Sequence, residues 1–222
     1  MSGFGKNDSP NLKLYPKIYC MKVFKKEFLL EGKIAVVTGA CGILGKQFCH
    51  GLAEMGANIA VVDMNEELCQ KFADELIKDH HVEALGVSCD VSSPNQVQTM
   101  INRVVDSLGG IHILHNNAAS KSEDLDAFFT PFEDYSLEEW RKIMAVNLDG
   151  MFLVAQAVGK QMIAQGKGGS VIQTASIYGI MAPDPRIYEG SSYLNRQINT
   201  PAVYSASKAG VIGLTKYLAA YW

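Results

Sequence analysis

Five short apolar runs, separated by stretches with a different periodicity, stand out along the chain. The first run, Ile34–Val37, is β-branched and has no polar alternation, which is typical of a strand buried on both faces of a parallel sheet. The regular succession of such runs and helical segments favours one α/β domain with a doubly wound parallel sheet. The predicted strands are Ile34–Val37, Ile59–Val62, Leu85–Ser88, Ile111–Leu114 and Val171–Thr174.

Between these runs, apolar residues recur at the spacing of α-helices. The first such helix follows Gly45, and a capping-box sequence at Ser136 predicts the start of a long helix that reaches Gln165. Asn147 lies among the apolar positions of this long helix, so we expect its amide to have a partner. The residues expected on the apolar faces of the first two helices are Phe48, Leu52, Met55, Leu68, Phe72, Leu76 and Ile77.

Three glycines join the first strand to the first helix. Gly39 can take a tight turn, Gly42 leaves no side chain between the backbone and a ligand, and Gly45 allows the helix to pack closely on the strand. The helix N-terminus offers unpaired N–H groups and the positive end of a dipole. The turn is therefore predicted to bind a pyrophosphate, although glycine turns of this kind also occur as purely structural features.

Two carboxylates follow the next strands. Asp63 lies 18 residues after Gly45, where a dinucleotide-binding fold places the group that accepts a hydrogen bond from a ribose 2′-hydroxyl. Because a carboxylate repels a 2′-phosphate, we expect NAD rather than NADP, with Lys46 as the residue that argues the other way. Asp90, before Val91, could reach the adenine edge of a dinucleotide or cap the following helix.

Composition narrows the classes of protein. The chain has 222 residues, 48% of them hydrophobic and 19% charged, and a net charge of −3, which argues against disorder and against a nucleic-acid partner. No apolar run approaches the ~20 residues of a membrane span, and no signal peptide is recognisable, so we expect a soluble cytoplasmic protein. Five cysteines without a CxxC pair argue against a disulfide framework and a zinc site, and no metal site is predicted.

A tyrosine and a lysine open the last helical segment. Tyr204 and Lys208 are four residues apart and share a helix face. A phenol with a pKa near ~10 is a poor base at neutral pH, and a neighbouring ammonium stabilises the phenolate. Such a pair is also common in simple surface packing. Ser176 stands at the carboxyl end of the fifth predicted strand.

Taken in order, these motifs resemble the short-chain dehydrogenase/reductase family. The resemblance covers Gly32 to Trp222, so residues 1–31 are interpreted as a leader. It is carried by TGACGILG at 38–45, Asp63, Asp90-Val91, NNAA at 116–119, Asn147, Ser176 and YSASK at 204–208.

The resemblance implies a three-layer Rossmann fold and an oxidoreductase that moves a hydride between nicotinamide C4 and the carbinol carbon of a secondary alcohol. Tyr204 would act as the acid/base, Lys208 would lower its pKa and bind the nicotinamide ribose, Ser176 would hold the substrate oxygen and Asn147 would anchor a proton-relay water. The residues expected to contact the cofactor are Thr38, Gly39, Gly42, Ile43, Leu44, Gly45, Asp63, Asp90, Val91, Asn117, Ala118, Tyr204 and Lys208.

The chain departs from the family pattern in three places. The glycine spacing is that of the longer, sugar-nucleotide branch, and Ala119 replaces the usual final glycine of NNAG. The gap of 28 residues between Ser176 and Tyr204 is unusually long. With its APDPRIYEG stretch it is similar to bacterial members linked to surface-sugar and flagellin-glycan biosynthesis.

Position suggests a role for the long gap. Residues 183–201 connect the strand end that bears Ser176 to the helix that bears Tyr204, so we predict a lid that faces the substrate. Arg186 is the candidate for an anionic or hydroxyl-rich group, and Tyr178 is a second candidate. A surface insertion with a solvated Arg186 is the alternative.

Family members continue beyond the helix that carries Lys208 into two further strands. We therefore expect the domain to be incomplete at Trp222 and weakly active alone, with a short form that dimerises through its fifth strand as the alternative. The complete domain is expected to form a homo-oligomer and to take a small-molecule substrate. Two rivals to the oxidoreductase are a dinucleotide-binding regulatory protein without turnover and a sugar epimerase or dehydratase with tightly held NAD.

Overall fold

The computed structural model describes residues 28–122, 124–193 and 195–222. Most of the expected leader therefore lies outside the described residues. Its last part is joined to the domain, because the Leu30 N–H donates to the Met55 carbonyl over 2.7 Å and the Leu30 side chain packs against the core.

Five parallel strands form the central sheet in the order β3-β2-β1-β4-β5. Ile34 and Val36 of β1 enter one apolar cluster, and Ala35 and Val37 enter another on the opposite face. Burial on both faces explains the missing polar alternation, and the predicted doubly wound parallel sheet is confirmed. The strands are β1 (Ile34–Thr38), β2 (Asn58–Asp63), β3 (Ala84–Ser88), β4 (Ile113–Asn116) and β5 (Ser170–Gln173).

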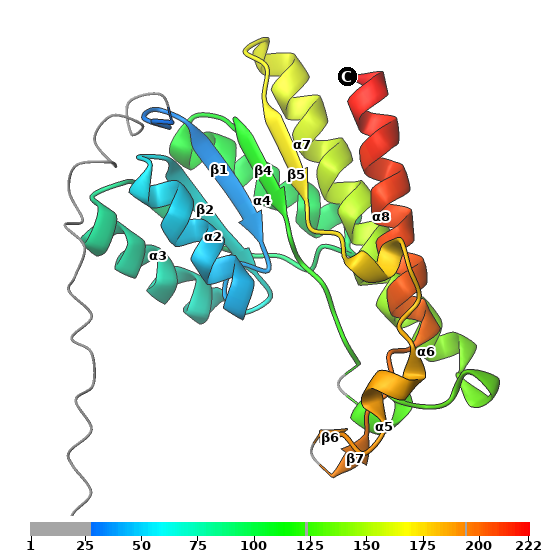
Figure 1. Ribbon diagram of the computed structural model, residues 1–222. Helices are drawn as coiled ribbons and strands as arrows, with labels where there is room; N and C mark the ends of the chain where they lie inside the picture. The colour runs from blue at the N-terminus through cyan, green and yellow to red at the C-terminus, as the bar shows by residue number, and fades with distance from the viewer. Residues whose placement is uncertain (1–27, 123, 194) are drawn as a thin grey trace, which may run out of the picture.

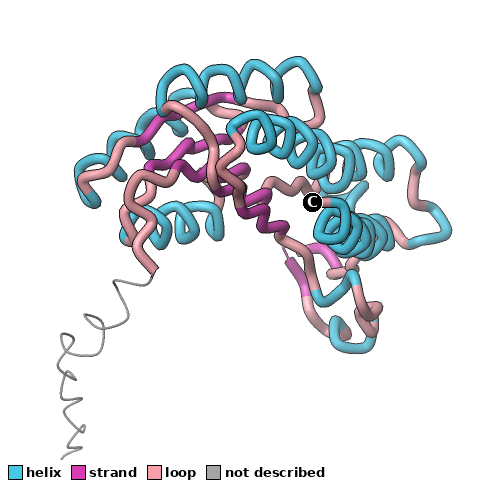
Figure 2. The backbone as a smooth tube through the Cα atoms, turned by 90° about the horizontal axis from the view of Figure 1, so that it is seen from above, coloured by secondary structure: helices cyan, strands magenta, loops and turns pink. Residues whose placement is uncertain are grey.

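Helices cover both faces of this sheet and complete the three layers (Figure 1). Residues of α2 and α3 share an apolar cluster with one face, and residues of α4, α7 and α8 pack on the other. Seen from above, the sheet runs between these helices (Figure 2). The helices are α2 (Ile43–Glu54), α3 (Glu66–His80), α4 (Pro94–Leu108), α5 (Leu125–Phe128), α6 (Leu137–Met144), α7 (Met151–Gln165) and α8 (Ala202–Tyr221).

A small lobe extends beyond the sheet, next to α6 (Figure 1). It contains α5 and the hairpin of β6 (Ser192–Tyr193) and β7 (Arg196–Gln197). Three 3₁₀ turns are also present, at Phe132–Asp134, Ile177–Gly179 and Pro185–Tyr188. The segment 183–201 thus has secondary structure of its own.

The fourth strand begins two residues later than predicted, at Ile113 rather than Ile111. The side-chain amide of Gln165 accepts from the Ile111 N–H over 2.8 Å and donates to the Ile111 carbonyl over 2.7 Å. A side chain from α7 therefore satisfies the backbone groups that a neighbouring strand would otherwise bond.

The long helix predicted from Ser136 to Gln165 is not a single α-helix. A π-helical segment, Ala145–Gly150, separates α6 from α7. It contains Asn147, whose side chain is fully buried and bonded to a distant loop. Such π segments are rare and often lie at functional sites.

The predicted apolar faces of α2 and α3 are confirmed in part, since Phe48 and Leu52 pack against the core and Phe72 and Leu76 are buried in it. The fully buried residues of α2 are the small Gly45, Cys49 and Ala53, which let the helix lie close to the sheet. In α3, Leu68 and Ile77 are 52% and 42% exposed. The buried residues of α3 are Cys69, Phe72, Ala73 and Leu76.

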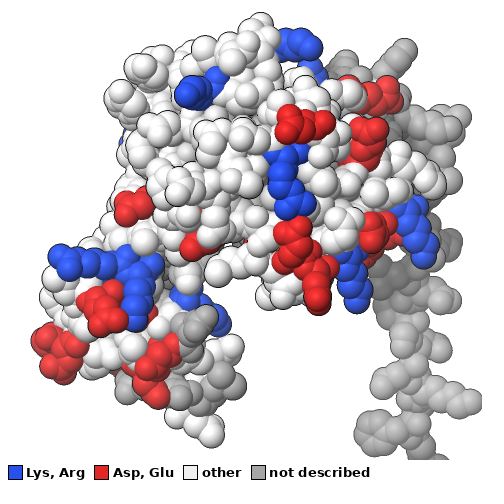
Figure 3. Space-filling model, turned by 180° about the vertical axis from the view of Figure 1, so that it is seen from behind, with Lys and Arg blue, Asp and Glu red and all other residues white. Residues whose placement is uncertain are grey.

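The surface carries both signs of charge. On the face shown in Figure 3, basic and acidic side chains are interspersed, without an extended area of one sign. Within the described ranges, no helix combines the length and hydrophobicity needed to cross a membrane.

Gly45 permits the closest backbone contact in the turn between β1 and α2. A Cβ atom there would lie 2.1 Å from the Gly39 carbonyl oxygen and 2.7 Å from the Ala40 Cα. These neighbours are backbone atoms and have no rotamer to change, so the turn would have to open. Gly51 lies on the same helix, and a Cβ atom there would meet nothing within 4 Å.

We predict that Gly45→Ala destabilises the protein by ~1–3 kcal/mol or more, because it forces overpacking against the backbone. Gly51→Ala is the matched control and should stabilise the fold by up to ~1 kcal/mol, since alanine has the higher helix propensity. Urea unfolding followed by circular dichroism measures both changes. Equal midpoints for the two variants would contradict the close contact.

Candidate active site

A cleft of about 810 Å³ opens at the carboxyl ends of the strands. It lies where the chain order reverses between β1 and β4, the usual place for a ligand in a doubly wound sheet. The residues that line it are Gly39, Cys41, Gly42, Ile43, Leu44, Gly45, Asp63, Met64, Leu68, Cys89, Asp90, Val91, Asn117, Ala118, Ala119, Ser120, Lys121, Val146, Thr174, Ala175, Tyr204 and Lys208.

The glycine turn forms one end of the cleft. Gly39 has a φ of 63°, in the left-handed region that glycine tolerates best. Gly42 is the N-cap of α2 and provides no side-chain cap, so the amides of the first helical turn are left for a ligand. Ile43 and Leu44 are 90% and 57% exposed and reach the cleft by their position in this turn. The arrangement suits an anionic group bound by backbone N–H groups.

Asp63 is held in place by the turn itself. Its Oδ2 accepts from the Cys41 N–H over 2.9 Å, and its Oδ1 accepts from the Met64 N–H over 2.8 Å. Lys46 does not line the cleft, and its Nζ lies 5.4 Å from the centroid of the Phe72 ring. The cation that could pair with a 2′-phosphate is therefore directed toward α3.

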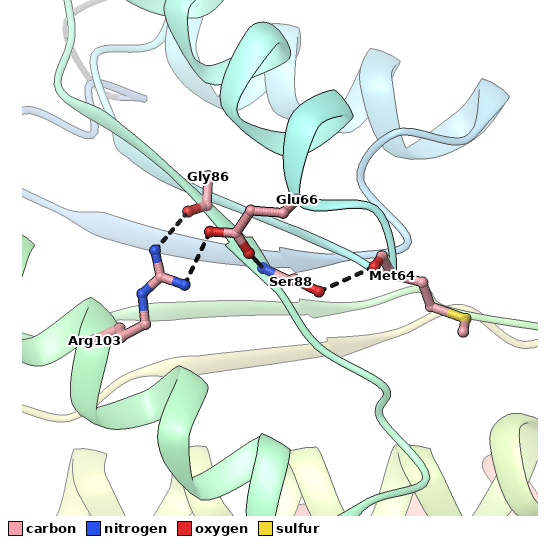
Figure 4. Close-up of polar contacts among 5 residues, drawn as sticks. All are labelled: Met64, Glu66, Gly86, Ser88 and Arg103. Atoms are coloured by element: carbon pink, nitrogen blue, oxygen red, sulfur yellow. Dashed lines mark hydrogen bonds and ion pairs between the residues drawn. The ribbon is translucent and has the colours of Figure 1, made fainter.

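A polar network fixes the segment that follows β2 (Figure 4). Glu66 accepts from the Ser88 N–H over 2.8 Å and forms an ion pair with Arg103 at 3.1 Å. The Ser88 hydroxyl donates to the Met64 carbonyl over 3.0 Å. These contacts hold Met64, a cleft residue, against the edge strand β3. A contact of this kind between separate elements leaves no local pattern in the sequence.

Asp90 does not cap α4. The N-cap is Ser93, whose hydroxyl accepts from the Gln96 N–H. The Asp90 carboxylate instead accepts from the backbone N–H and hydroxyl of Ser92, over 2.9 and 2.7 Å. Asp90 remains in the cleft lining, together with the apolar Val91.

Hydrogen bonds tie the ends of β1 and β4 together. The Thr38 hydroxyl accepts from the Asn117 and Ala118 N–H groups over 2.9 and 3.0 Å. The Asn117 amide donates to the Thr38 carbonyl over 3.1 Å. Thr38, which we expected to contact the cofactor, is fully buried and absent from the cleft lining, so the structure shows it joining the two strands.

Tyr204 and Lys208 share one face of α8 and line the same cleft. The Lys208 Nζ lies 5.9 Å from the centroid of the Tyr204 ring and donates to the Thr174 carbonyl over 2.8 Å. Lys208 is only 2% exposed, and its burial lowers the pKa of the ammonium. The lysine is therefore fixed between the end of β5 and the tyrosine.

Ser176 follows β5 and begins a 3₁₀ turn that packs against α8. It caps the turn Ile177–Gly179, because its hydroxyl accepts from the Tyr178 N–H over 3.2 Å. A Cβ at Gly179 would lie 2.6 Å from the carbonyl carbon of Lys208, so the turn packs directly on the helix. The rings of Tyr178 and Tyr204 meet edge to face with centroids 6.5 Å apart.

Asn147 has the partner that its amide required. Its Oδ1 accepts from the Ser120 N–H over 2.7 Å, and its Nδ2 donates to the Ser120 carbonyl over 3.1 Å. Ser120 lines the cleft whereas Asn147 does not. The π segment thus holds the loop after β4 in position.

The two predicted substrate residues lie in different surroundings. Arg186 is 81% exposed and pairs with Asp184, and it does not line the cleft. The Tyr178 hydroxyl contacts the Tyr188 hydroxyl at 3.0 Å, and Tyr188 in turn contacts Thr200 at 2.8 Å. Only Tyr178 is thereby brought next to Tyr204.

Comparison with known proteins gives a consistent picture. The short chain dehydrogenase family matches residues 33–222. A D-threitol dehydrogenase of Mycolicibacterium smegmatis is 37% identical over 88% of this chain and 66% of its own length. An NADH-dependent L-xylulose reductase of Ambrosiozyma monospora is 33% identical over 88% of this chain and 68% of its own length. The chain thus spans about two thirds of the length of these relatives.

Solved structures agree. A short-chain type dehydrogenase/reductase from Mycobacterium marinum superposes with a TM-score of 0.73 at 36% identity, over 87% of this chain and 68% of the other. An NAD⁺-bound xylitol dehydrogenase superposes with a TM-score of 0.71 at 33% identity, over 85% of this chain and 64% of the other. With the family match, the fold and the site, we conclude that the chain belongs to the short chain dehydrogenase family.

Proposed function

We propose that this protein is an NAD-dependent oxidoreductase for a secondary alcohol or ketone in a polyol or sugar derivative. The observation that carries the proposal is that Tyr204 and Lys208 line the same cleft as the glycine turn and Asp63. A proton donor, a cation and a site for a dinucleotide then face one another. Relatives named as D-threitol dehydrogenase and L-xylulose reductase support the substrate class.

The residues of the cleft fit a nicotinamide dinucleotide. Gly39 and Gly42 leave backbone exposed for a pyrophosphate, and the fixed Asp63 carboxylate suits a ribose hydroxyl. The exposed side of Leu68 and the Val91 side chain offer an apolar wall for a base. When bound, the cofactor would supply the hydride acceptor or donor.

The side chains near Tyr204 have distinct tasks in this proposal. The Tyr204 hydroxyl exchanges a proton with the substrate oxygen, and the Lys208 ammonium favours the phenolate. The Ser176 hydroxyl accepts from the Tyr178 N–H, so its own hydrogen is free to donate to the substrate oxygen. Asn147 holds the loop after β4 through both backbone groups of Ser120, and in this proposal it anchors the proton-relay water.

A second tyrosine beside Tyr204 suits a hydroxylated substrate in this proposal. The Tyr178 ring meets the Tyr204 ring, its hydroxyl is linked to that of Tyr188, and hydroxyl groups can both donate and accept. Neither Tyr178 nor Tyr188 is among the residues that line the cleft itself. Sugar derivatives are our first choice of substrate, because relatives named as D-threitol dehydrogenase and L-xylulose reductase act on such compounds and the APDPRIYEG stretch resembles surface-sugar and flagellin-glycan proteins.

The proposal is tested with a panel of alditols, ketoses, sugar acids and nucleotide sugars, with NADH formation as the readout. Tyr204→Phe should lower kcat by ~10²–10⁴-fold, because it removes only the transferable proton, while NAD affinity survives. Lys208→Ala should impair both kcat and NAD affinity. A Phe variant with more than a few per cent of the wild-type kcat would contradict the role of Tyr204.

The panel also separates the two rival functions. A regulatory protein would bind NAD and turn over no substrate. An epimerase or dehydratase would convert a sugar with bound cofactor and no net NADH. Neither outcome is compatible with a dehydrogenase.

We predict a preference for NAD over NADP, since Asp63 repels a 2′-phosphate of up to two negative charges. Asp63→Ala should reduce this preference by at least about tenfold, the equivalent of ~1.4 kcal/mol. The measurement is kcat/KM for both cofactors in wild type and variant. Lys46→Ala is the control and should leave the ratio unchanged, because its ammonium faces Phe72; a wild type that prefers NADP would overturn the assignment.

For the segment 183–201, we predict that Arg186→Ala raises the KM for the sugar substrate and leaves NAD affinity alone. The exposed Arg186 is free to leave Asp184 when an anionic or hydroxyl-rich group enters, because surface ion pairs are weak. Lys142→Ala, which removes another exposed cation paired to an acid, is the charge-matched control. An unchanged KM would favour a plain surface insertion.

A further inference from the structure

Two thiols meet directly behind the glycine turn. Cys41 is part of the turn, is partly exposed and lines the cleft. Cys69 lies in α3 and is fully buried. Their sulfur atoms are 3.9 Å apart, and a disulfide bond requires about 2 Å. Neither thiol has a task in the proposed reaction.

We infer that Cys41 and Cys69 form an oxidation site in which Cys41 reacts first and Cys69 closes a disulfide that blocks the cleft. The oxidant would be a small disulfide such as oxidised glutathione. Cys41 attacks one of its sulfurs, forms a mixed disulfide and releases one glutathione thiol. Cys69 then attacks the Cys41 sulfur and releases the second, so two protein thiols are oxidised and their two protons end on glutathione.

The order of the two steps follows from the surroundings. An oxidant in the cleft can reach Cys41, whereas Cys69 lies behind it. Burial, together with the charge of Cys41, raises the pKa of the Cys69 thiol to about 12. Burial and the charge of Asp63 also raise the pKa of Cys41, and the hydrogen bond with Cys69 and the charge of Lys46 oppose that rise in part. Because the thiolate is the nucleophile, the reaction should accelerate as the pH increases.

Closure of this bond would distort the cofactor end of the cleft. The Cys41 N–H donates to Asp63, and the adjacent Ala40 N–H donates to the Val62 carbonyl over 3.0 Å. Drawing the Cys41 sulfur about 2 Å toward α3 pulls on the backbone that these bonds hold. The oxidised protein should therefore bind a dinucleotide poorly, and a bound dinucleotide should shield Cys41. The effect on dinucleotide binding rests on the proposed function, whereas the pairing of the two thiols does not.

The experiment treats the reduced full chain with oxidised glutathione at pH 7 and pH 9, with and without NAD. Peptide mapping by mass spectrometry under non-reducing conditions should find the Cys41–Cys69 pair, faster at pH 9 and slower with NAD. Calorimetric titration should show NAD affinity reduced by at least about tenfold, about 1.4 kcal/mol, and restored by dithiothreitol. Far-UV circular dichroism checks that the fold survives oxidation.

Variants identify the role of each thiol. Cys69→Ala should bind NAD normally when reduced and accumulate a glutathione adduct at Cys41, because the closing thiol is missing. Cys41→Ala should leave Cys69 unmodified. Cys49→Ala, which removes another fully buried thiol, should still form the pair.

Three results would overturn the inference. The peptide map could lack the Cys41–Cys69 pair, or it could show a disulfide to Cys49 instead. The third is a fully formed Cys41–Cys69 disulfide in a protein whose NAD affinity is unchanged. A reduced protein that binds no NAD would contradict the proposed function and the blocking of the cleft, while the peptide map would still decide whether the two thiols pair.

Discussion

The cleft of this protein depends on backbone atoms that lie almost in contact. The turn after β1 passes so near to the start of α2 that a Cβ at Gly45 would lie 2.1 Å from the Gly39 oxygen. On its other side, a Cβ at Gly39 would lie 2.9 Å from the Cα of Ala118. Only a side-chain-free backbone fits between a helix and a neighbouring strand at these distances. The same lack of side chains leaves the helix N-terminus open to an anion.

Hydrogen bonds to the backbone hold the remaining walls of the cleft in register with this turn. Thr38 bonds two successive N–H groups at the end of β4, and Asp63 bonds an N–H group of the turn. Asn147 bonds both backbone groups of Ser120. In each case one polar side chain fixes main chain from another element, and an amide or carboxylate buried this way needs such partners. The walls are therefore rigid, as a site that positions a ligand requires.

The catalytic side is assembled differently, by packing of one segment on one helix. The 3₁₀ turn after β5 lies against α8, where Gly179 leaves no room for a side chain beside Lys208. This contact sets Tyr178, two residues after Ser176, next to Tyr204, although Tyr204 lies 28 positions after Ser176 in the chain. The inserted segment can therefore form its own lobe without displacing the groups that we propose to carry the chemistry.

Local patterns in the sequence determined much of this arrangement. Short apolar runs predicted the five strands of the sheet, and the glycine spacing with Asp63 predicted the cofactor end of a cleft. The lack of polar alternation predicted burial for β1, whereas β5 is partly exposed at the edge of the sheet. Each of these patterns lies within a short stretch of sequence, because strand burial, helix capping and tight turns depend on residues that are close together in the chain. The four-residue spacing of Tyr204 and Lys208 belongs to the same class.

Only the tertiary structure decided which distant groups meet. Gln165 bonds the backbone of Ile111, and β4 begins only at Ile113. The Asn147 region became a π segment, Leu68 turned toward the cleft, and Arg186 paired with Asp184. The contact of Cys41 with Cys69 likewise joins two elements. Such pairs depend on how helices and strands close on one another, and the partner of a buried polar group is fixed only when the chain is folded.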